Sequence, residues 1–173
     1  VSPLKAGRVF FAGAAPGQDR RMTTLPTIQL LPGHDRRVKH GHPWVFSNEI
    51  RMDAAARALP PGGPVRVEGA DGVRHGVWHF NPHSLIALDR RLAEAPDAAW
   101  FRTRLAAALA LRERLGVARH CRLVHAEADG LPGLVVDRFG DVLAVQANTA
   151  GMDAALPMIV GALRDLLAPR AIL

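Results

Sequence analysis

The period of the hydrophobic pattern changes near residue 94, and this change limits the fold more than any other feature of the sequence. Between residues 27 and 92, short runs of alternating apolar and polar residues end at glycine, proline or asparagine, which is typical of β-strands joined by tight turns. From residue 98 to 115, apolar residues recur at helical spacing, with Asp97 placed to cap the helix and Gly116 to end it. The sequence therefore predicts an α+β protein.

The first predicted unit, residues 25–93, has the pattern of a small β-barrel. Asp71 and Gly72 form a hairpin turn signal between two of its strands. Trp78 and Phe80 stand two residues apart and are therefore expected on one face of their strand. The expected strands are residues 27–31, 64–68, 75–80 and 85–88.

The rest of the chain predicts a linker helix, residues 97–117, and an incomplete α/β domain, residues 118–173, of strand-strand-helix-strand order. Asp153 is placed to cap the helix of that domain. The last three residues begin an apolar run that then stops, so we expect a fragment of a longer protein. The hairpin strands of the domain are expected at residues 133–137 and 142–146.

Composition restricts the setting in which the protein works. The single cysteine, Cys121, excludes an intramolecular disulfide and fits a reducing compartment, so we expect a cytoplasmic protein. No apolar run approaches the ~20 residues that a membrane helix needs. Residues 1–24 mix glycine, proline and alanine without a period and are predicted to be a disordered extension, with Met22 as an alternative start to Val1. A homodimer stays open, because nothing in the sequence fixes the oligomeric state.

The basic side chains favour a nucleic-acid partner. Arginine supplies 20 of the 22, and its planar guanidinium suits phosphate and base-edge recognition better than lysine does. The alternative is a GC-rich genome, which would raise arginine and alanine together without selection for any ligand. The positions of the arginines are therefore more informative than the net charge of +6.

One segment, residues 39–46, places basic and histidine side chains beside two aromatic ones. Unpaired RNA bases stack on aromatic rings while cations neutralise phosphates, so this segment and the arginines before it form a candidate RNA-binding site. For Trp44 and Phe46, the alternative of burial in the core is favoured. The candidate RNA-binding residues are Arg36, Arg37, Lys39, His42 and Trp44.

Other clusters predict no catalytic or metal site. His75, His79 and His83 recur every four residues, but on a strand that spacing does not bring their rings together. Cys121 lies next to a histidine and would suit a thiolate nucleophile, although an inert buried cysteine is commoner. The carboxylates within residues 127–133 are best explained by a turn, and no glycine-rich cradle for SAM or a dinucleotide is found. We therefore name no catalytic, cofactor-binding or metal-binding residue, and a metal or thiol enzyme is the weakest alternative.

Four short motifs follow one another in the chain: HPWVF at residues 42–46, NPHSLI at 81–86, DGLPGL at 129–134 and DRFG at 137–140. In this order and spacing they resemble the class I SAM-dependent large-subunit (23S) rRNA cytosine-C5 methyltransferase family. The resemblance covers about residues 25–173, and the last two motifs are the most distinctive.

The resemblance implies an N-terminal PUA domain, which is a small RNA-binding pseudo-barrel, then a central α/β domain, and beyond this chain a catalytic domain with a SAM loop and a cysteine nucleophile. It implies S-adenosyl-L-methionine as cofactor of full-length members and large-subunit rRNA as partner, with no cofactor held by this chain. Cys121 does not match the catalytic cysteine motif. Two hypotheses follow: a part that docks rRNA for an absent catalytic domain and is inactive alone, or a stand-alone PUA-type RNA-binding module without enzymatic activity.

Overall fold

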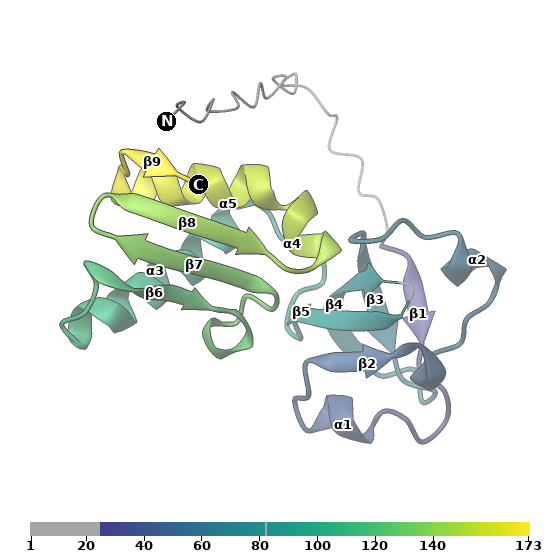
Figure 1. The fold of residues 1–173 in the computed structure, drawn as a ribbon. Coiled ribbons are helices and arrows are strands. Elements are labelled where there is room, and N and C mark those ends of the chain that lie inside the picture. The colour runs from purple at the N-terminus through teal and green to yellow at the C-terminus, as the bar shows by residue number, and fades with distance from the viewer. Residues whose placement is uncertain (1–24, 82) are drawn as a thin grey trace, which may run out of the picture.

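The computed structural model describes residues 25–81 and 83–173, so the predicted disordered extension, residues 1–24, lies outside the described residues. Figure 1 shows two units, a curled sheet made of β1 to β5 and a second sheet made of β6 to β9 with helices behind it. The long helix α3, Ala98–Arg114, carries the chain from the first unit into the second. The predicted α+β class, a small barrel-like sheet followed by a helix and an α/β unit, is confirmed.

The first sheet has the order β1-β3-β4-β5-β2 and is parallel only between β1 and β3. Its two edge strands, β1 and β2, are connected through the residues that follow them in the chain. Leu30 and Ile50 form an antiparallel bridge, and the Arg51 backbone N–H donates to the Gln29 carbonyl at 2.8 Å. The sheet is thereby curled around one core. Its strands are β1 Thr27–Gln29, β2 Trp44–Phe46, β3 Pro64–Glu68, β4 Arg74–Asn81 and β5 Ser84–Asp89, with the short helices α1 Arg36–Lys39, η1 Ser47–Glu49 and α2 Ala54–Arg57 between them.

The core of the curled sheet follows from the alternation of side chains along its strands. Trp78 and Phe80 both point into it and are fully buried, as their spacing predicted. The Trp78 indole donates to the His75 carbonyl at 2.8 Å, so the one polar atom of this large side chain is satisfied. Val65, Val67 and Leu85 fill the space around the two rings.

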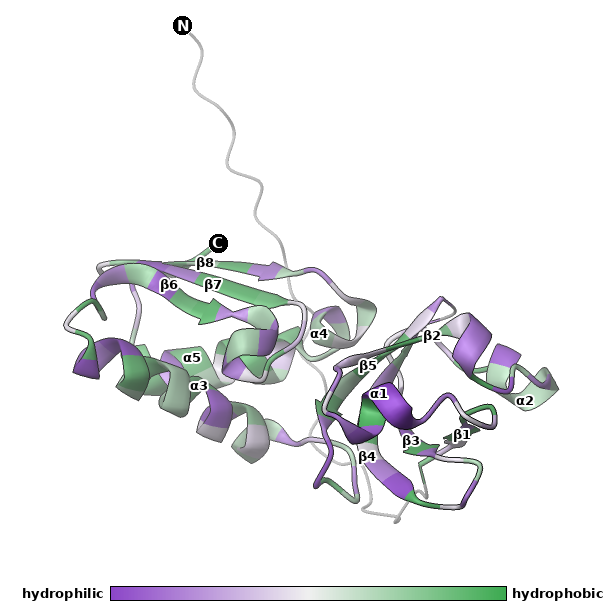
Figure 2. Ribbon diagram, turned by 90° about the horizontal axis from the view of Figure 1, so that it is seen from below, coloured by the Kyte–Doolittle hydropathy of each residue, from purple (hydrophilic) through white to green (hydrophobic). Residues whose placement is uncertain are grey.

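The second sheet has the order β6-β7-β8-β9 and is antiparallel except between β8 and β9. The helices α3 and α5 pack against each other on one face of it, and Figure 2 shows them beneath the sheet. The opposite face carries no helix of the described residues. The elements after α3 are β6 His120–His125, η2 Ala126–Asp129, β7 Leu134–Phe139, β8 Val142–Ala147, α4 Ala150–Ala154, α5 Leu156–Leu167 and β9 Ala171–Ile172.

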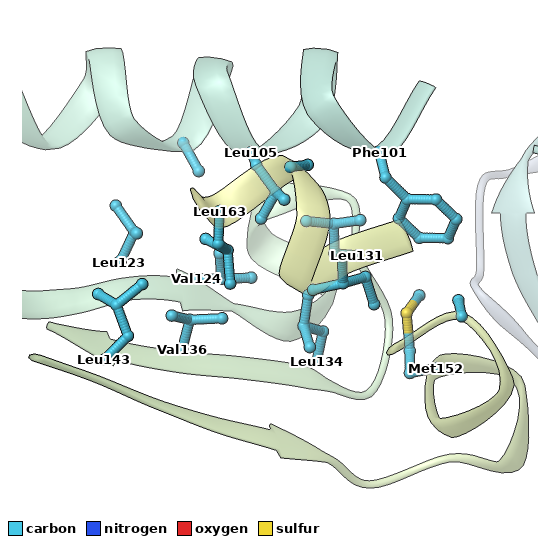
Figure 3. Close-up of a cluster of buried hydrophobic side chains, with 14 of the residues drawn as sticks. Phe101, Leu105, Leu123, Val124, Leu131, Leu134, Val136, Leu143, Met152 and Leu163 are labelled. Carbon is cyan, nitrogen blue, oxygen red and sulfur yellow. The ribbon is translucent and has the colours of Figure 1, made fainter. Parts of the chain in front are cut away.

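The second core lies between this sheet and its two helices. Figure 3 shows Phe101 and Leu105 of α3 pointing toward the sheet, with Leu163 of α5 beside them. Leu134 and Val136 of β7 face them from the sheet and are fully buried. The predicted hairpin of β7 and β8 is confirmed. The predicted apolar stripe of α3 is confirmed at Phe101 and Leu105, which face the core.

Three sequence expectations for this unit were incomplete or wrong. Strand β6 was not predicted. Asp153 does not cap a helix, because the Thr149 hydroxyl caps α4 by accepting from the Met152 N–H, and α5 starts separately, with Pro157 in its first turn. A proline lacks the N–H needed further inside a helix. Leu115, expected on the apolar stripe, is 66% exposed, because α3 ends one residue before it.

The two units meet along the outer face of β4. Val77 lies next to the inward-pointing Trp78 of that strand, faces outward, and packs into the second core. His79, also on the outer face, is 5% exposed and lies directly against Gly151 of α4. A Cβ at Gly62 would lie 2.5 Å from the Ala150 carbonyl oxygen. At this junction the Gly62 backbone therefore lies close to the Ala150 backbone, and the Gly151 backbone lies close to the His79 ring. Neither glycine has room for added side-chain atoms. The domain boundaries expected from the sequence, 25–93, 97–117 and 118–173, stay predictions.

We predict that Gly151→Ala destabilises the protein, because its Cβ would overlap the His79 ring. Overpacking of this kind costs about 1–3 kcal/mol. Gly161→Ala is the matched control, since Gly161 lies in helix α5 with no atom within 4 Å of its added Cβ, and alanine is the better helix former. Urea unfolding should show a lower midpoint for the first variant only, and equal midpoints would contradict the packing described.

Stability should also fall below neutral pH because of His79. Burial lowers the pKa of His79 from 6.5 to about 4. Between these values the unfolded chain binds a proton that the folded chain does not, so the free energy of unfolding decreases as the pH drops through this window, by up to about 1.4 kcal/mol per pH unit. Above pH 6.5 this group contributes no pH dependence. Urea unfolding at about pH 7, 6 and 5, values chosen to span this window, measures the slope.

The His79→Gln variant removes the titrating group and should flatten this slope. The slope that remains includes His75, whose pKa is lowered by burial and then by the charge of Arg90. An unchanged slope in His79→Gln would show that this imidazole is already protonated in the folded state near the acidic end of the series.

Candidate nucleic-acid interface

The candidate RNA-binding residues lie on α1 and on the turn and strand that follow it. Val38 is the buried residue of α1 and faces the first core. Because the helix is only one turn long, its other side chains point to solvent, and Arg36, Arg37 and Lys39 are exposed. The structure therefore brings the three predicted cations together on one small surface, which we call the α1 surface.

Arg37 is held by a buried carboxylate. Its Nη2 donates to Glu49 Oε2 at 2.6 Å, and the Phe46 backbone N–H donates to the same oxygen at 2.8 Å. Glu49 is 9% exposed. Burial alone would raise the pKa of Glu49, but the bonds from Phe46 and Arg37 outweigh it and the pKa is lowered. An ionised carboxylate thus fixes both the strand end and the guanidinium.

Phe46 is not a core residue, and the favoured sequence interpretation was wrong for it. Val45 is the inward residue of β2, so its neighbours face away from the core. Phe46 is 47% exposed, and the Arg37 guanidinium lies over its ring with its carbon 5.4 Å from the ring centre. The result is a stacked cation and aromatic ring at the protein surface, a pair that the sequence analysis did not single out.

The three cations of the α1 surface differ in their availability. Lys39 pairs with Asp35 and with Asp71, the latter at 3.0 Å, and hydrogen bonds to these two carboxylates raise its pKa. Arg37 pairs with Glu49. Within the described part of the chain, no acidic group pairs with Arg36. Arg36 is therefore the cation most ready to meet a phosphate.

His42 and Trp44 follow this surface along the chain, and His42 is exposed whereas Trp44 is half-buried. The Trp44 N–H donates to His42 Nδ1 at 3.2 Å. The Trp44 indole donates across to the Glu127 carboxylate of η2 at 3.2 Å, and the ring is half-buried. Trp44 thus lies at the seam between the two units. Glu49 and Glu127 were not predicted as partners here. Glu49 had one signal in the sequence, since it lies three residues after Phe46, the spacing at which a side chain accepts from a helix-entry N–H.

The other polar groups singled out from the sequence serve the fold. Asp129 accepts from the His125 N–H at 2.6 Å and from Arg112 Nη2 at 2.8 Å. Burial alone would raise the pKa of Asp129, but these bonds outweigh it and the pKa is lowered. Gly130 then turns the chain in the left-handed conformation, with φ of 68°. The turn interpretation of these carboxylates is confirmed.

Cys121 has the environment of an inert thiol. Its Sγ lies 3.8 Å from the Ala118 carbonyl oxygen, and burial is the main cause that raises its pKa. A raised pKa keeps the thiol protonated, whereas a nucleophile needs the thiolate. Of the three histidines, His75 and His79 are buried and His83 is exposed. No group of three or more potential metal ligands occurs among the residues that the structure describes.

Two comparisons with known proteins define the class of protein, one for the first unit and one for the fold of the chain. Residues 28–88 match the PUA-like domain family, so the curled sheet is a PUA-like domain. The chain superposes with a TM-score of 0.70 on a Streptococcus mutans protein assigned as a SAM-dependent methyltransferase, at 13% identity, covering 86% of this chain and 41% of that one. A second structure, assigned as a methyltransferase and solved with SAH bound, gives the same TM-score. These likenesses establish the fold.

The sequence relatives of this chain include proteins named ribosomal RNA large subunit methyltransferase I, and this chain matches part of them. The protein of that name from Shewanella denitrificans is 38% identical over 135 residues, which are 73% of this chain and 33% of the relative. The one from Klebsiella pneumoniae is 33% identical over 158 residues, 86% of this chain and 38% of the relative. The chain is therefore homologous to part of this methyltransferase family and spans about a third of the length of these relatives, as the motif resemblance predicted. None of the helices in the described ranges is long and apolar enough to cross a membrane.

Glu49→Gln should destabilise the PUA-like domain, because the neutral amide leaves Arg37 without its charged partner and weakens the bond from Phe46. Weakening the hydrogen bonds of a buried carboxylate costs roughly 1–3 kcal/mol, and the contribution of the half-exposed Arg37 is reduced by solvent screening. Glu68→Gln is the control, since its partner Arg74 is exposed and surface pairs contribute about 1 kcal/mol or less. Thermal unfolding of both variants tests this. An equal loss in both would mean that the Glu49 cluster contributes no more than a surface pair.

Proposed function

We propose that this chain is the RNA-binding N-terminal part of a SAM-dependent rRNA (cytosine-C5) methyltransferase, and that it docks large-subunit rRNA for a catalytic domain outside residues 1–173. The observation that carries the proposal is the α1 surface, where Arg36, which has no acidic partner among the described residues, precedes a stacked arginine and phenylalanine on a PUA-like domain. The names of the relatives supply the class of RNA and the reaction.

The chemistry of the α1 surface suits unpaired RNA. Arg36 would neutralise a phosphate, because no described carboxylate competes for it. The exposed ring of Phe46 offers a face for an unstacked base, and Arg37 extends that face as a planar cation. Trp44 would contribute the open part of its ring, since its indole N–H is engaged by Glu127. His42 lies close enough along the chain to contribute a further donor or acceptor.

The role proposed for the chain is binding, not catalysis. S-adenosyl-L-methionine would be held by the catalytic domain of the full-length protein, and we assign no residue of this chain to it. A reducing compartment, which the single cysteine Cys121 fits, agrees with a cytoplasmic location. Methyl transfer by this chain alone would overturn the assignment, whereas RNA binding by a protein that never joins a catalytic domain would support the stand-alone module instead.

We predict that Arg36→Ala weakens binding to fragments of large-subunit rRNA more than Lys39→Ala does, because Lys39 is already paired with two carboxylates. Replacing Arg36, Arg37 and Lys39 together by alanine should also reduce the slope of log affinity against log salt by about 0.7–0.9 for each phosphate that is no longer neutralised. Fluorescence anisotropy across a salt series measures both quantities, with labelled SAM in a parallel methyl-transfer assay.

The control is Arg57→Ala on α2 of the same domain, an exposed arginine without an ion pair among the described residues. It lowers the net charge by the same amount. If Arg57→Ala and Arg36→Ala weaken binding equally, the effect is one of overall charge and the α1 surface does not bind the RNA.

A further inference from the structure

An exposed aromatic side chain lies at the far end of the second unit. Phe139 is the last residue of β7 and is 59% exposed. Leu134 and Val136 of the same strand are buried toward α3 and α5, so Phe139, by alternation, lies on the sheet face without helices. In Figures 1 and 2 the turn from β7 to β8 lies at the end of the sheet away from the PUA-like domain.

Two exposed residues with basic side chains, His120 and Arg119, lie next to Phe139. His120 is the direct cross-strand partner of Phe139 and is exposed, and directly opposed residues share a sheet face. Arg119 lies beside the turn, because its carbonyl accepts from the Gly140 N–H at 2.8 Å. Arg138, the residue before Phe139, has the parity of Leu134 and Val136 and therefore faces the helices instead, where it is half-buried. We call Arg119, His120 and Phe139 the hairpin surface.

Little of this positive charge is neutralised. Asp141, in the same turn, pairs with Arg170 at 3.1 Å. Arg119 forms no ion pair with a carboxylate among the residues described. An exposed arginine without a described acidic partner therefore lies next to an open aromatic ring, which is an arrangement that attracts a polyanion with planar groups.

We propose that the hairpin surface is a second binding site for single-stranded RNA, in which Phe139 stacks on an unpaired base, Arg119 binds a neighbouring phosphate and His120 offers a further hydrogen bond. The inference rests on the proposed function, since it assigns a second site to the same ligand. A protein partner is the alternative that the binding experiment separates from RNA, since arginine and aromatic side chains are also common in protein interfaces. The two surfaces lie on different units, so one RNA strand long enough to reach both gains affinity from each.

The test compares Phe139→Leu with Phe139→Tyr in binding a labelled single-stranded RNA of mixed sequence and about 12 nucleotides. Leucine keeps an apolar side chain but removes the aromatic face, whereas tyrosine keeps it. We expect Phe139→Leu to weaken binding about five- to hundredfold, the range that corresponds to one stacked base, and Phe139→Tyr to stay within about threefold of the parent. Arg119→Ala should reduce the salt slope by about 0.7. Val117→Ala, an exposed apolar neighbour in sequence, is the control and should bind like the parent.

The outcomes separate this inference from the proposed function when Arg36→Ala is measured with the same probe. Weaker binding in both Arg36→Ala and Phe139→Leu supports both surfaces. Weaker binding in Arg36→Ala alone overturns the hairpin surface and leaves the α1 surface standing, and weaker binding in Phe139→Leu alone does the reverse. Unchanged RNA affinity together with a shift in the sedimentation of Phe139→Leu would identify a protein interface and overturn the inference. Arg119→Ala keeps the test valid if the leucine variant does not fold.

Discussion

Strand β4 belongs to two cores at once, and the arrangement of the whole chain depends on it. Its inward residues Trp78 and Phe80 fill the PUA-like domain, while Val77 enters the core of the second unit and His79 packs against Gly151. A strand that is covered on both faces cannot expose either face without returning apolar surface to water. The two units are therefore joined by shared packing rather than by a connecting helix alone.

Buried carboxylates fix the local structure on both sides of that junction in the same way. Glu49 accepts from a backbone N–H and from Arg37, and Asp129 accepts from a backbone N–H and from Arg112. In both places the hydrogen bonds offset the cost of removing the charge from water. One carboxylate holds the exposed Phe46 in place, and the other ties η2 to α3.

Ion pairing, more than the number of basic residues, decides which cations remain for RNA. Six arginines of the described chain are engaged in ion pairs; Arg122, for example, pairs with Asp137 and Arg104 with Asp89. Two arginines without an ion pair among the described residues, Arg36 and Arg119, lie in the fold next to segments that carry an exposed aromatic ring, one on each unit.

The sequence by itself determined the elements that local chemistry dictates. The β3–β4 and β7–β8 hairpins, the helix α3 and the turn at Gly130 were predicted from alternation, helical period and glycine, since these signals depend only on near neighbours. The motifs also led to the family with which the chain shares partial homology. The tertiary structure alone showed that Phe46 is exposed, that Thr149 and not Asp153 caps a helix, and that His79 meets Gly151. Those facts depend on how the elements fold and pack together, and local pattern carries no information about which distant partner will fill or cover a site.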